Sequence, residues 1–295
     1  MVYFLPISFT IVGLFVGSFL NMLIDRFYTG EQIIKGRSHC DLCKHALGWK
    51  DLIPLLSYIT LGGKCRYCHK PIGWQNAVVE VTTAGVFGLL ATTLPNSLDL
   101  RNLSLLSSLW LGYSLVITSL LIITFFSDLK FGVIYQELII IGVVLTLLFF
   151  VANDITSIIG IKNTLAQDAF GKHLLQTNYL NNLIEKVIRE RIFWVIGALG
   201  AFTFFYLLHK MFKGRAMGRG DADLAFLVAL IVGFPNVLVS LFFSFLTGAF
   251  VGVILIALGK KTLKAKIPFG PFLIMGLVIG LLFGNRIIKW YIGLI

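Results

Sequence analysis

The sequence contains few charged residues. Asp, Glu, Lys and Arg make up 13% of the 295 residues, whereas hydrophobic residues make up 57%. Soluble domains carry about 25% charged and about 45–50% apolar residues, so this composition excludes an ordinary soluble globular domain. Apolar runs of roughly 18 or more residues recur along the chain, and each is long enough to cross about 30 Å of hydrocarbon. The sequence therefore predicts a protein that crosses the membrane several times.

The apolar runs also lack two signals. None alternates apolar and polar residues as β-barrel strands do, and the first has neither a positive flank nor a small-residue cleavage site, so we expect it to be a retained span. Because a lipid-exposed backbone must satisfy its own hydrogen bonds, we expect helices. The predicted fold class is an all-α polytopic integral membrane protein with about eight transmembrane helices, at residues 4–24, 76–95, 104–126, 133–152, 191–209, 221–235, 237–258 and 268–288.

Positive charge is scarce on one side of these predicted spans. With the N-terminus outside, the cytosolic segments hold 17 of the 25 Lys and Arg residues; these segments are 25–75, 127–132, 210–220 and 259–267. The asymmetry follows the positive-inside rule, and the net charge of +11 suits a bilayer with anionic lipids as partner. No basic patch is interleaved with aromatic residues, so nucleic acid is not an expected partner.

The segment 221–235 is short for a full crossing. Reading 221–258 as one crossing would place the basic residues of 259–266 outside, which the positive-inside rule disfavours, so we expect eight crossings. A long external segment then lies at about 153–190. Apolar residues between 174 and 188 predict an amphipathic helix on the membrane surface there, to which the sequence assigns no function.

Cysteine is absent outside the loop at 25–75. All four cysteines lie there, Cys40 and Cys43 in CDLC and Cys65 and Cys68 in CRYC. Two thiolates separated by two residues can bind one edge of a metal ion, and a second pair completes a tetrahedron. Disulfides are disfavoured in the cytosol, so we interpret the four as a structural zinc site, with redox-active or idle cysteines as the alternatives. A closed four-thiolate site indicates a role in folding rather than hydrolysis.

Acidic residues are also scarce, so the few beside apolar segments are informative. Asp128 follows one long apolar run and Asp221 begins another, both at the predicted cytosolic edge of the bilayer. Ionisable groups at such places are costly and usually functional. The alternatives are a turn residue for Asp128 and, for Asp221, a helix N-terminal residue that complements the helix dipole.

Two aspartates on different helices at one depth are suited to peptide hydrolysis. Two close carboxylates share a proton, so one acts as a base toward water while the other donates to the scissile carbonyl. Gly218 and Gly220 would not obstruct a substrate backbone, and we predict that they lie next to the substrate. Glu80, about a turn inside the second span, is a further polar candidate without an assigned role.

Five ordered sequence blocks carry a family resemblance. They are GSFLNMLIDR (17–26), the cysteine-containing segment 40–80, SDLKFGVI (127–134), GRGDADL (218–224) and IPFGPFL (267–273). Together they resemble the bacterial type IV prepilin peptidases, also called leader peptidase/N-methyltransferases, of the GxGD aspartic protease class. A lone GxGD would be a weak signal, whereas five blocks in order over most of the chain are specific.

The resemblance implies that Asp128 and Asp221 are the catalytic pair of a membrane aspartic endopeptidase and that the cysteines hold zinc. It implies cleavage of the leader of prepilins or pseudopilins at the cytosolic face of the bacterial inner membrane. It also implies N-methylation of the new N-terminus with S-adenosylmethionine, for which the sequence shows no glycine-rich binding fold. The implied parts are 1–95, with two spans and the zinc loop, and 104–295, with six spans and the peptidase site.

The sequence departs from the family at two places near the predicted catalytic residues. Tyr135 and Gln136 follow Ile134 where the family usually has Pro and then Asp or Asn, and Asp223 stands where Lys is common. Neither departure removes a predicted catalytic carboxylate.

Two other classes of function remain open. A transporter or channel could bind protons or cations with Asp128, Asp221 and Glu80, but the acidic residues cluster at one face rather than along a path across the bilayer. A non-catalytic scaffold could bind a partner through its zinc loop, and such a protein would be indifferent to Asp→Asn changes.

Overall fold

The structure is a computed structural model, and it describes residues 4–32, 36, 38–40, 42–92, 105–167, 169–214, 217–259 and 267–293. The described residues form helices and no strands, with two isolated β-bridges in the cysteine loop, so the all-α prediction is confirmed. The chain divides into two compact units, Met1–Ser127 and Asp128–Ile295. The end of the predicted second span (93–95) and the basic stretch 260–266 lie outside the described residues.

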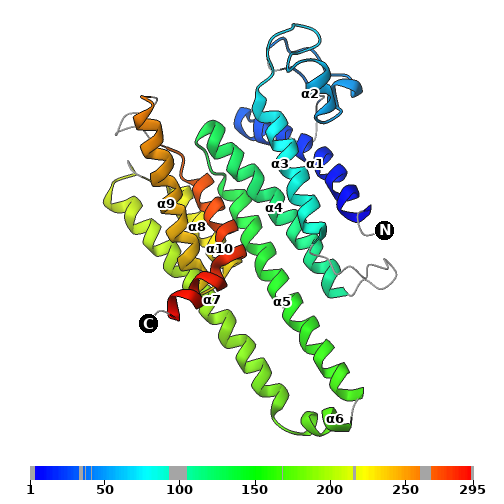
Figure 1. Ribbon diagram of the computed structural model, residues 1–295, viewed down its shortest axis with the longest axis vertical. Coiled ribbons are helices and arrows are strands. Elements are labelled where there is room, and N and C mark those ends of the chain that lie inside the picture. The colour runs from blue at the N-terminus through cyan, green and yellow to red at the C-terminus, as the bar shows by residue number, and fades with distance from the viewer. Residues whose placement is uncertain are drawn as a thin grey trace. The chain divides into compact units, whose positions relative to one another are not determined.

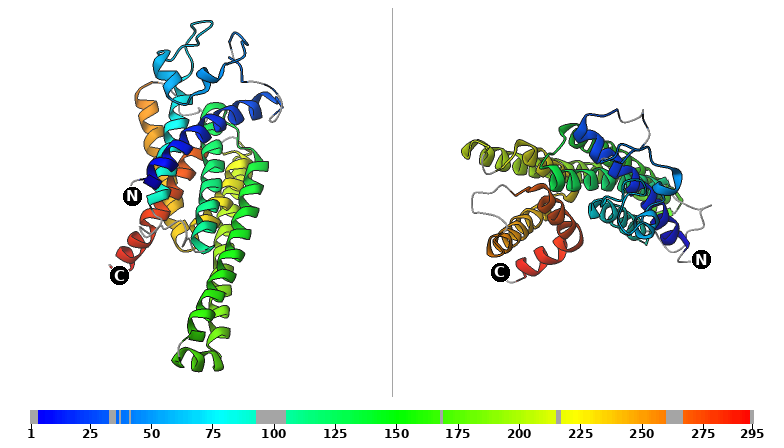
Figure 2. Two further views of the ribbon diagram at one scale, coloured as in Figure 1. Left: turned by 90° about the vertical axis from the view of Figure 1, so that its right-hand side faces the viewer. Right: turned by 90° about the horizontal axis from the view of Figure 1, so that it is seen from above.

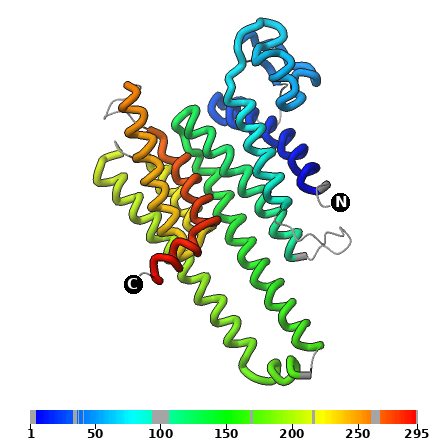
Figure 3. Tube along the Cα trace, in the orientation of Figure 1, coloured from blue at the N-terminus to red at the C-terminus, as the bar shows by residue number. Residues whose placement is uncertain are grey.

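The first unit contains two packed helices joined by the cysteine loop. Its elements in chain order are α1 (Phe4–Thr29), the 3-10 helix η1 (Trp49–Leu52), α2 (Leu56–Thr60), α3 (Trp74–Thr92) and most of α4 (Leu105–Phe131). Helices α1 and α3 lie against each other, and the loop with η1 and α2 lies at one end of this pair (Figure 3).

Glycines allow α1 and α3 to approach closely. A Cβ atom on Gly13 would lie 2.7 Å from Ala84 Cα, and one on Gly17 would lie 2.7 Å from Glu80 Cα. Gly13 and Gly17 are four residues apart, the spacing at which small residues form a close-packing face on membrane helices. The close approach brings Glu80 of α3 beside Gly17, near the middle of α1.

The second unit is built around α8. Its helices after the end of α4 are α5 (Gln136–Gln167), α6 (Ala169–Gln176), α7 (Tyr179–Met211), α8 (Arg219–Val232), α9 (Asn236–Ala257) and α10 (Gly270–Ile292). Helix α8 packs against α5, α7, α9 and α10, and nine of its 14 residues are buried (Figure 1). The helix that carries Asp221 is therefore held on several sides.

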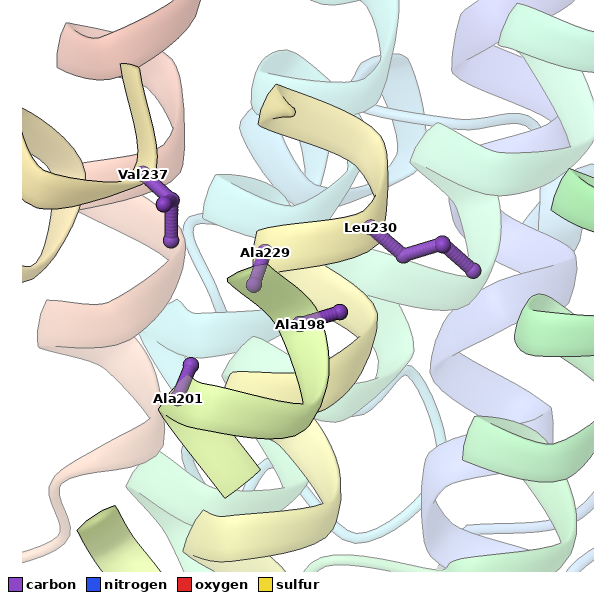
Figure 4. Close-up of a cluster of buried hydrophobic side chains, with 5 residues drawn as sticks. All are labelled: Ala198, Ala201, Ala229, Leu230 and Val237. Carbon is purple, nitrogen blue, oxygen red and sulfur yellow. The ribbon is translucent and has the colours of Figure 1, made fainter. Parts of the chain in front are cut away.

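Small side chains let α8 occupy this central place. Ala198 and Ala201 of α7 lie beside Ala229 and Leu230 of α8, together with Val237 of α9 (Figure 4). All five are at most 5% exposed. Alanine at helix interfaces shortens the distance between helix axes, which strengthens van der Waals packing where the hydrophobic effect contributes little.

Helices α5 and α7 are much longer than predicted. With 32 and 33 residues they are each about 48–50 Å long at 1.5 Å per residue, and they run side by side past the other helices of their unit to α6 (Figures 1 and 2). The predicted surface-lying amphipathic helix between 174 and 188 is wrong, because residues from Tyr179 onward continue without a break into the α7 span. Arg191 of α7 forms a bidentate ion pair with Asp154 of α5, in which Nε donates to Oδ2 at 2.8 Å and Nη2 donates to Oδ1 at 2.7 Å.

Six of the described helices are long and apolar enough to cross a membrane, namely α1, α4, α5, α7, α9 and α10. The chain is therefore a multi-pass membrane protein, and the count of eight crossings stays a prediction. Helix α8 has 14 residues and spans only about 21 Å, which is less than the roughly 30 Å hydrocarbon core.

Candidate active site and metal centre

Asp128 lies in the last turn of α4. Gly132 ends this helix with a φ of +67°, a conformation that glycine adopts without strain, and its N–H donates to the Asp128 carbonyl. The Asp128 side chain is 4% exposed, and its Oδ2 accepts the N–H of Gly270 at 2.8 Å. Gly270 begins α10, so the Asp128 carboxylate lies at the N-terminus of another helix, where the helix dipole favours negative charge.

Asp221 is the third residue of α8 and is 7% exposed. Its Oδ2 accepts the N–H of Gly218, the residue before the helix, at 2.8 Å. This arrangement satisfies one of the N–H groups that a helix N-terminus leaves unpaired. The interpretation of Asp221 as a helix N-terminal residue is therefore confirmed, and it leaves the other carboxylate oxygen for a second role.

The two carboxylates belong to one site in the second unit. The Asp128 charge acts on Asp221, so the two groups are close enough to interact electrostatically. Each carboxylate is held through Oδ2 by a single backbone N–H, and within the described residues neither Oδ1 atom accepts a hydrogen bond. The arrangement combines two nearby, nearly buried carboxylates with one unengaged oxygen each.

Ile134 packs against Gly220 and Gly270, which lie beside the two aspartates. A Cβ on Gly220 would lie 2.9 Å from Ile134 Cβ, and one on Gly270 would lie 2.6 Å from Asp128 Oδ2 and 3.3 Å from Ile134 Cδ1. A Cβ on Gly218 would meet only Asp221 Oδ2, at an ordinary 3.4 Å. Close packing against Ile134 therefore favours glycine at position 220. The proximity of Gly218 and Gly220 to the substrate stays a prediction.

Two residues at this site had no role in the sequence interpretation. Gly270 stood inside the block IPFGPFL but carried no chemistry of its own, and only the tertiary fold brings its N–H to Asp128 across 142 residues. His209, at the end of α7, interacts electrostatically with Asp221, and its Nδ1 lies 2.9 Å from the Met217 carbonyl. No local pattern distinguishes His209 from an ordinary helix-end histidine.

The two departures from the family pattern contact each other. Gln136 Nε2, in the first turn of α5, donates to Asp223 Oδ2 in α8 at 2.8 Å. Asp223 and Asp221 are separated by about 200° around the helix, because each residue advances it by about 100°. The hydrogen bond therefore ties α8 to α5 on the side away from the Asp221 carboxylate.

The four cysteines form one cluster in the first unit. Their Sγ atoms all lie within 4.8 Å of one another, and Cys40 Sγ lies 4.0 Å from Cys68 Sγ. Four sulfurs at about 2.3 Å from a zinc ion in a tetrahedron would be separated by about 3.8 Å, so the cluster fits a metal ion of this kind. The predicted meeting of the two pairs is confirmed.

Each cysteine pair is built in the same way. The residue after the second cysteine, Lys44 or His69, has a φ of +56° and donates its N–H to the carbonyl of the first cysteine. This turn folds each CxxC segment so that both of its sulfurs point to one place. The Cys68 N–H hydrogen-bonds the Cys65 sulfur and, with the Tyr67 N–H, lowers the pKa of the Cys65 thiol to about 7 although burial opposes the shift. A lowered pKa favours the thiolate that binds metal.

An ion pair joins the cysteine pairs to η1. Asp51 Oδ1 accepts Arg66 Nε at 2.6 Å, and Asp51 Oδ2 accepts the Gly48 N–H at 3.1 Å. Desolvation raises the pKa of the Asp51 carboxyl, but Arg66 and the Gly48 N–H together hold it below its usual value. The centre of the His45 ring lies 3.7 Å from that of the Tyr67 ring, which links the segments of the two cysteine pairs directly.

Two family models match separate parts of the chain. The model described as Bacterial Peptidase A24 N-terminal domain matches residues 11–94, and the model described as Type IV leader peptidase family matches residues 179–253. A protein of Bacillus subtilis (strain 168) named Prepilin leader peptidase/N-methyltransferase is 27% identical over 285 residues, covering 96% of each chain. The chain belongs to the prepilin leader peptidase/N-methyltransferase family.

Further relatives carry the same name. The protein of Pseudomonas aeruginosa is 25% identical and covers 97% of this chain and 94% of its own length, and that of Myxococcus xanthus (strain DK1622) is 28% identical with 85% and 63% covered. No solved structure matches the chain. As a member of this leader peptidase family the chain is a membrane protease, and the names of its relatives add an N-methyltransferase activity.

The family matches include some site residues and not others. The cysteine cluster and Glu80 lie within residues 11–94, and Asp221 lies within 179–253. Asp128 and Gly270 lie outside both matched regions. Their connection to the leader peptidase site therefore rests on the geometry of the second unit.

Proposed function

We propose that this protein cleaves the leader of type IV prepilins or pseudopilins with Asp128 and Asp221 as its catalytic pair. The observation that carries the proposal is that two nearly buried carboxylates from different helices of the second unit interact electrostatically, with Ile134 packed against the glycines beside both. The names of the full-length relatives supply the substrate class.

The geometry suits hydrolysis by a shared proton. Two nearby carboxylates in a site of low dielectric hold one proton between them, so that one is a base and the other an acid. The base removes a proton from water, which attacks the peptide carbonyl, while the acid donates a proton to the carbonyl oxygen. Collapse of the tetrahedral intermediate breaks the C–N bond, and the amine leaves with a proton. The Gly218 and Gly270 N–H groups hold one oxygen of each carboxylate, which leaves the other for water or substrate.

We propose that the site lies at the cytosolic face of the bacterial inner membrane. Asp221 is in the first turn of α8, and Asp128 is in the last turn of α4, which are the ends that the distribution of Lys and Arg assigns to the cytosol. A peptide bond near this interface is within reach of water, whereas one at the bilayer centre is not.

One further activity and a structural metal also belong to the proposal. The relatives' names support N-methylation of the new N-terminus, and S-adenosylmethionine is the methyl donor we propose for it. The cysteine cluster holds structural zinc in this proposal, because four thiolates close the coordination sphere and leave no open position for a substrate.

The test of the catalytic pair is substitution of each aspartate by asparagine. Asp128→Asn and Asp221→Asn keep the shape of the side chain and the acceptor for the backbone N–H but remove the ionisable group. We expect each to abolish cleavage of a co-expressed prepilin, measured by the mobility and N-terminal mass of the pilin, while membrane insertion is unchanged.

Asp223→Asn is the matched control for this test. It makes the same chemical change two residues along α8, on the other side of the helix, and keeps an acceptor for Gln136. We expect it to retain cleavage. Unchanged cleavage in Asp128→Asn or Asp221→Asn would overturn the catalytic assignment and favour the scaffold, whereas proton or cation flux lost in the same variants would favour the transporter.

A further inference from the structure

The first unit contains a polar cavity apart from the peptidase aspartates. Its volume is about 210 Å³, and it lies between α1, α3 and the cysteine loop. Its polar lining includes Ser18, Asn21, Asp25, Arg26, Asn76 and Glu80. The proposed peptide hydrolysis uses none of these residues.

Glu80 is a buried carboxylate with neutral hydrogen-bond partners. It is 8% exposed, its Oε2 accepts the Leu55 N–H at 2.7 Å, and the Ser18 hydroxyl also hydrogen-bonds it. No cation lies within ion-pair distance of Glu80 among the described residues. Burial of a carboxylate without a cationic partner is costly, so the Glu80 side of the cavity favours a positively charged ligand.

Arg26 gives the same cavity a buried positive charge. It is 7% exposed, and its guanidinium donates to the Gln32 carbonyl at 3.0 Å and to the Gly36 carbonyl at 3.2 Å, which together fix its direction. Asp51 also lines the cavity, but it is ion-paired with Arg66. Glu80 and Arg26 thus add a buried charge of each sign to the lining, and the amide of Asn21 is held between α1 and α3 by a 2.8 Å hydrogen bond to the Asn76 carbonyl. A ligand that carries both charges within a few ångströms complements such a lining.

We propose that this cavity binds the charged amino-acid end of S-adenosylmethionine, with Glu80 facing its sulfonium and Arg26 its carboxylate. The inference rests on the methyltransferase activity in the proposed function, and it locates the methyl-donor site in the first unit. A cavity of about 210 Å³ is smaller than the roughly 300–1,000 Å³ that encloses a drug-sized ligand, so the nucleoside end lies at its mouth.

The chemistry of the donor fits this placement. When methyl transfer occurs, the amine nitrogen forms a bond to the methyl carbon, the carbon–sulfur electron pair returns to sulfur, and the amine loses one proton. The sulfonium charge is thereby lost, and the product, S-adenosylhomocysteine, is a neutral thioether at that position. A carboxylate that faces the sulfonium therefore distinguishes donor from product.

This distinction provides the test. Glu80→Gln removes the charge but keeps an acceptor for the Leu55 N–H. We expect the variant to bind S-adenosylmethionine about tenfold more weakly while its affinity for S-adenosylhomocysteine changes little, because only the first carries the sulfonium. Binding is measured by equilibrium dialysis with the purified full-length protein, and metal content reports whether the first unit is folded.

Two further variants separate binding from structure. Glu185→Gln makes the same change on an exposed part of α7, where the side chain is 67% exposed, and should bind both ligands as the wild type does. Ser18→Leu fills the cavity beside Glu80 and should weaken both ligands together.

Several outcomes would overturn the proposal. The wild type could fail to bind either ligand, Glu80→Gln could weaken both equally, or Glu80→Gln could lose its metal, which would make Glu80 a structural anchor for Leu55. Cleavage of prepilin by the same wild-type preparation is measured in parallel, so a failure of this site is distinguished from a failure of the proposed peptidase.

Discussion

Asp128 and Asp221 are each positioned by one backbone N–H group of a glycine. Backbone donors keep their place when neighbouring side chains change, so the orientation of both carboxylates depends on the paths of α8 and α10 rather than on side-chain partners. The sequence could identify the aspartates, because carboxylates are rare beside apolar runs. It could not identify Gly270, whose contact with Asp128 exists only in the folded second unit.

The Gly270 position provides a prediction at this scale. Gly270→Ala places a Cβ 2.6 Å from Asp128 Oδ2, so the carboxylate must move while the backbone N–H donor remains. Displacement of a catalytic group by about 1 Å can cost about 100-fold in rate, and we expect a loss of cleavage rate of that order. Cleavage of a prepilin by purified enzyme measures it.

Gly200→Ala is the control for the glycine substitution. Gly200 lies in α7 with no atom within 4 Å of a Cβ built there, so the same added methyl group should leave the cleavage rate unchanged. A Gly270→Ala enzyme as active as Gly200→Ala would show that Asp128 tolerates displacement.

At the scale of elements, the short connection between α4 and α5 organises the second unit. Gly132 ends α4, Ile134 packs against Gly220 and Gly270, and Gln136 bonds to α8. Within five residues the connection therefore contacts both α8 and α10, whose N-terminal backbone amides hold the carboxylates of the proposed catalytic pair. From the sequence, this connection was recognisable as part of a family block that lacks the usual proline, but its contacts with α8 and α10 were not.

The bond between Gln136 and Asp223 can be tested by a double-mutant cycle. We expect Gln136→Ala and Asp223→Ala each to lower the cleavage rate several-fold and the double variant to lower it little further, because both single changes break the same bond. A hydrogen bond of this kind contributes roughly 0.5–1.5 kcal/mol. Additive effects in the double variant would show that the Gln136–Asp223 hydrogen bond does not support the cleavage rate. Gln176→Ala on α6 serves as the unrelated control.

The cysteine loop supports a second prediction for an element. We expect about one zinc per chain in the purified protein, measured by plasma mass spectrometry, and loss of that zinc in Cys40→Ser with Cys43→Ser, because two thiolates cannot complete a tetrahedral site. His69→Asn should keep the metal, since asparagine tolerates the positive φ at this position and His69 is not in the cluster. Disulfides in the native membrane would contradict the metal assignment.

Helix limits show where sequence reasoning succeeded and failed. The apolar runs predicted the limits of most long helices within a few residues, because burial in lipid requires continuous apolar sequence. The extensions of α5 and α7 were missed, since charged residues such as Lys162 and Glu185 end a hydrophobic run but do not end a helix. Water-exposed helix carries no hydropathy signal, so only the structure gives its length.

At the scale of the whole molecule, the chemistry is divided between the two units. The described part of the first unit holds the cysteine cluster and the charged cavity, whereas the second holds the aspartate pair. The cavity was not predictable, because Glu80 and Arg26 line the same cavity only once α1 and α3 have packed.

The length of α8 has a consequence for the lipid around the enzyme. At about 21 Å, α8 is too short for an ordinary bilayer, while α5 and α7 are longer than the roughly 40–45 Å of a typical bilayer with its headgroups. Mismatch between a hydrophobic segment and its bilayer costs fractions of a kcal/mol per ångström, enough to shift where a helix end lies. A thicker bilayer therefore buries the first turn of α8, with Asp221, further from water.

We expect the cleavage rate to fall as the acyl chains of reconstituted vesicles are lengthened, with the amount of inserted enzyme held equal. Equal rates across acyl lengths would show that Asp221 keeps its access to water by another route. If the rate does fall, a cell that changes its fatty acids with temperature also changes how fast its pilins mature.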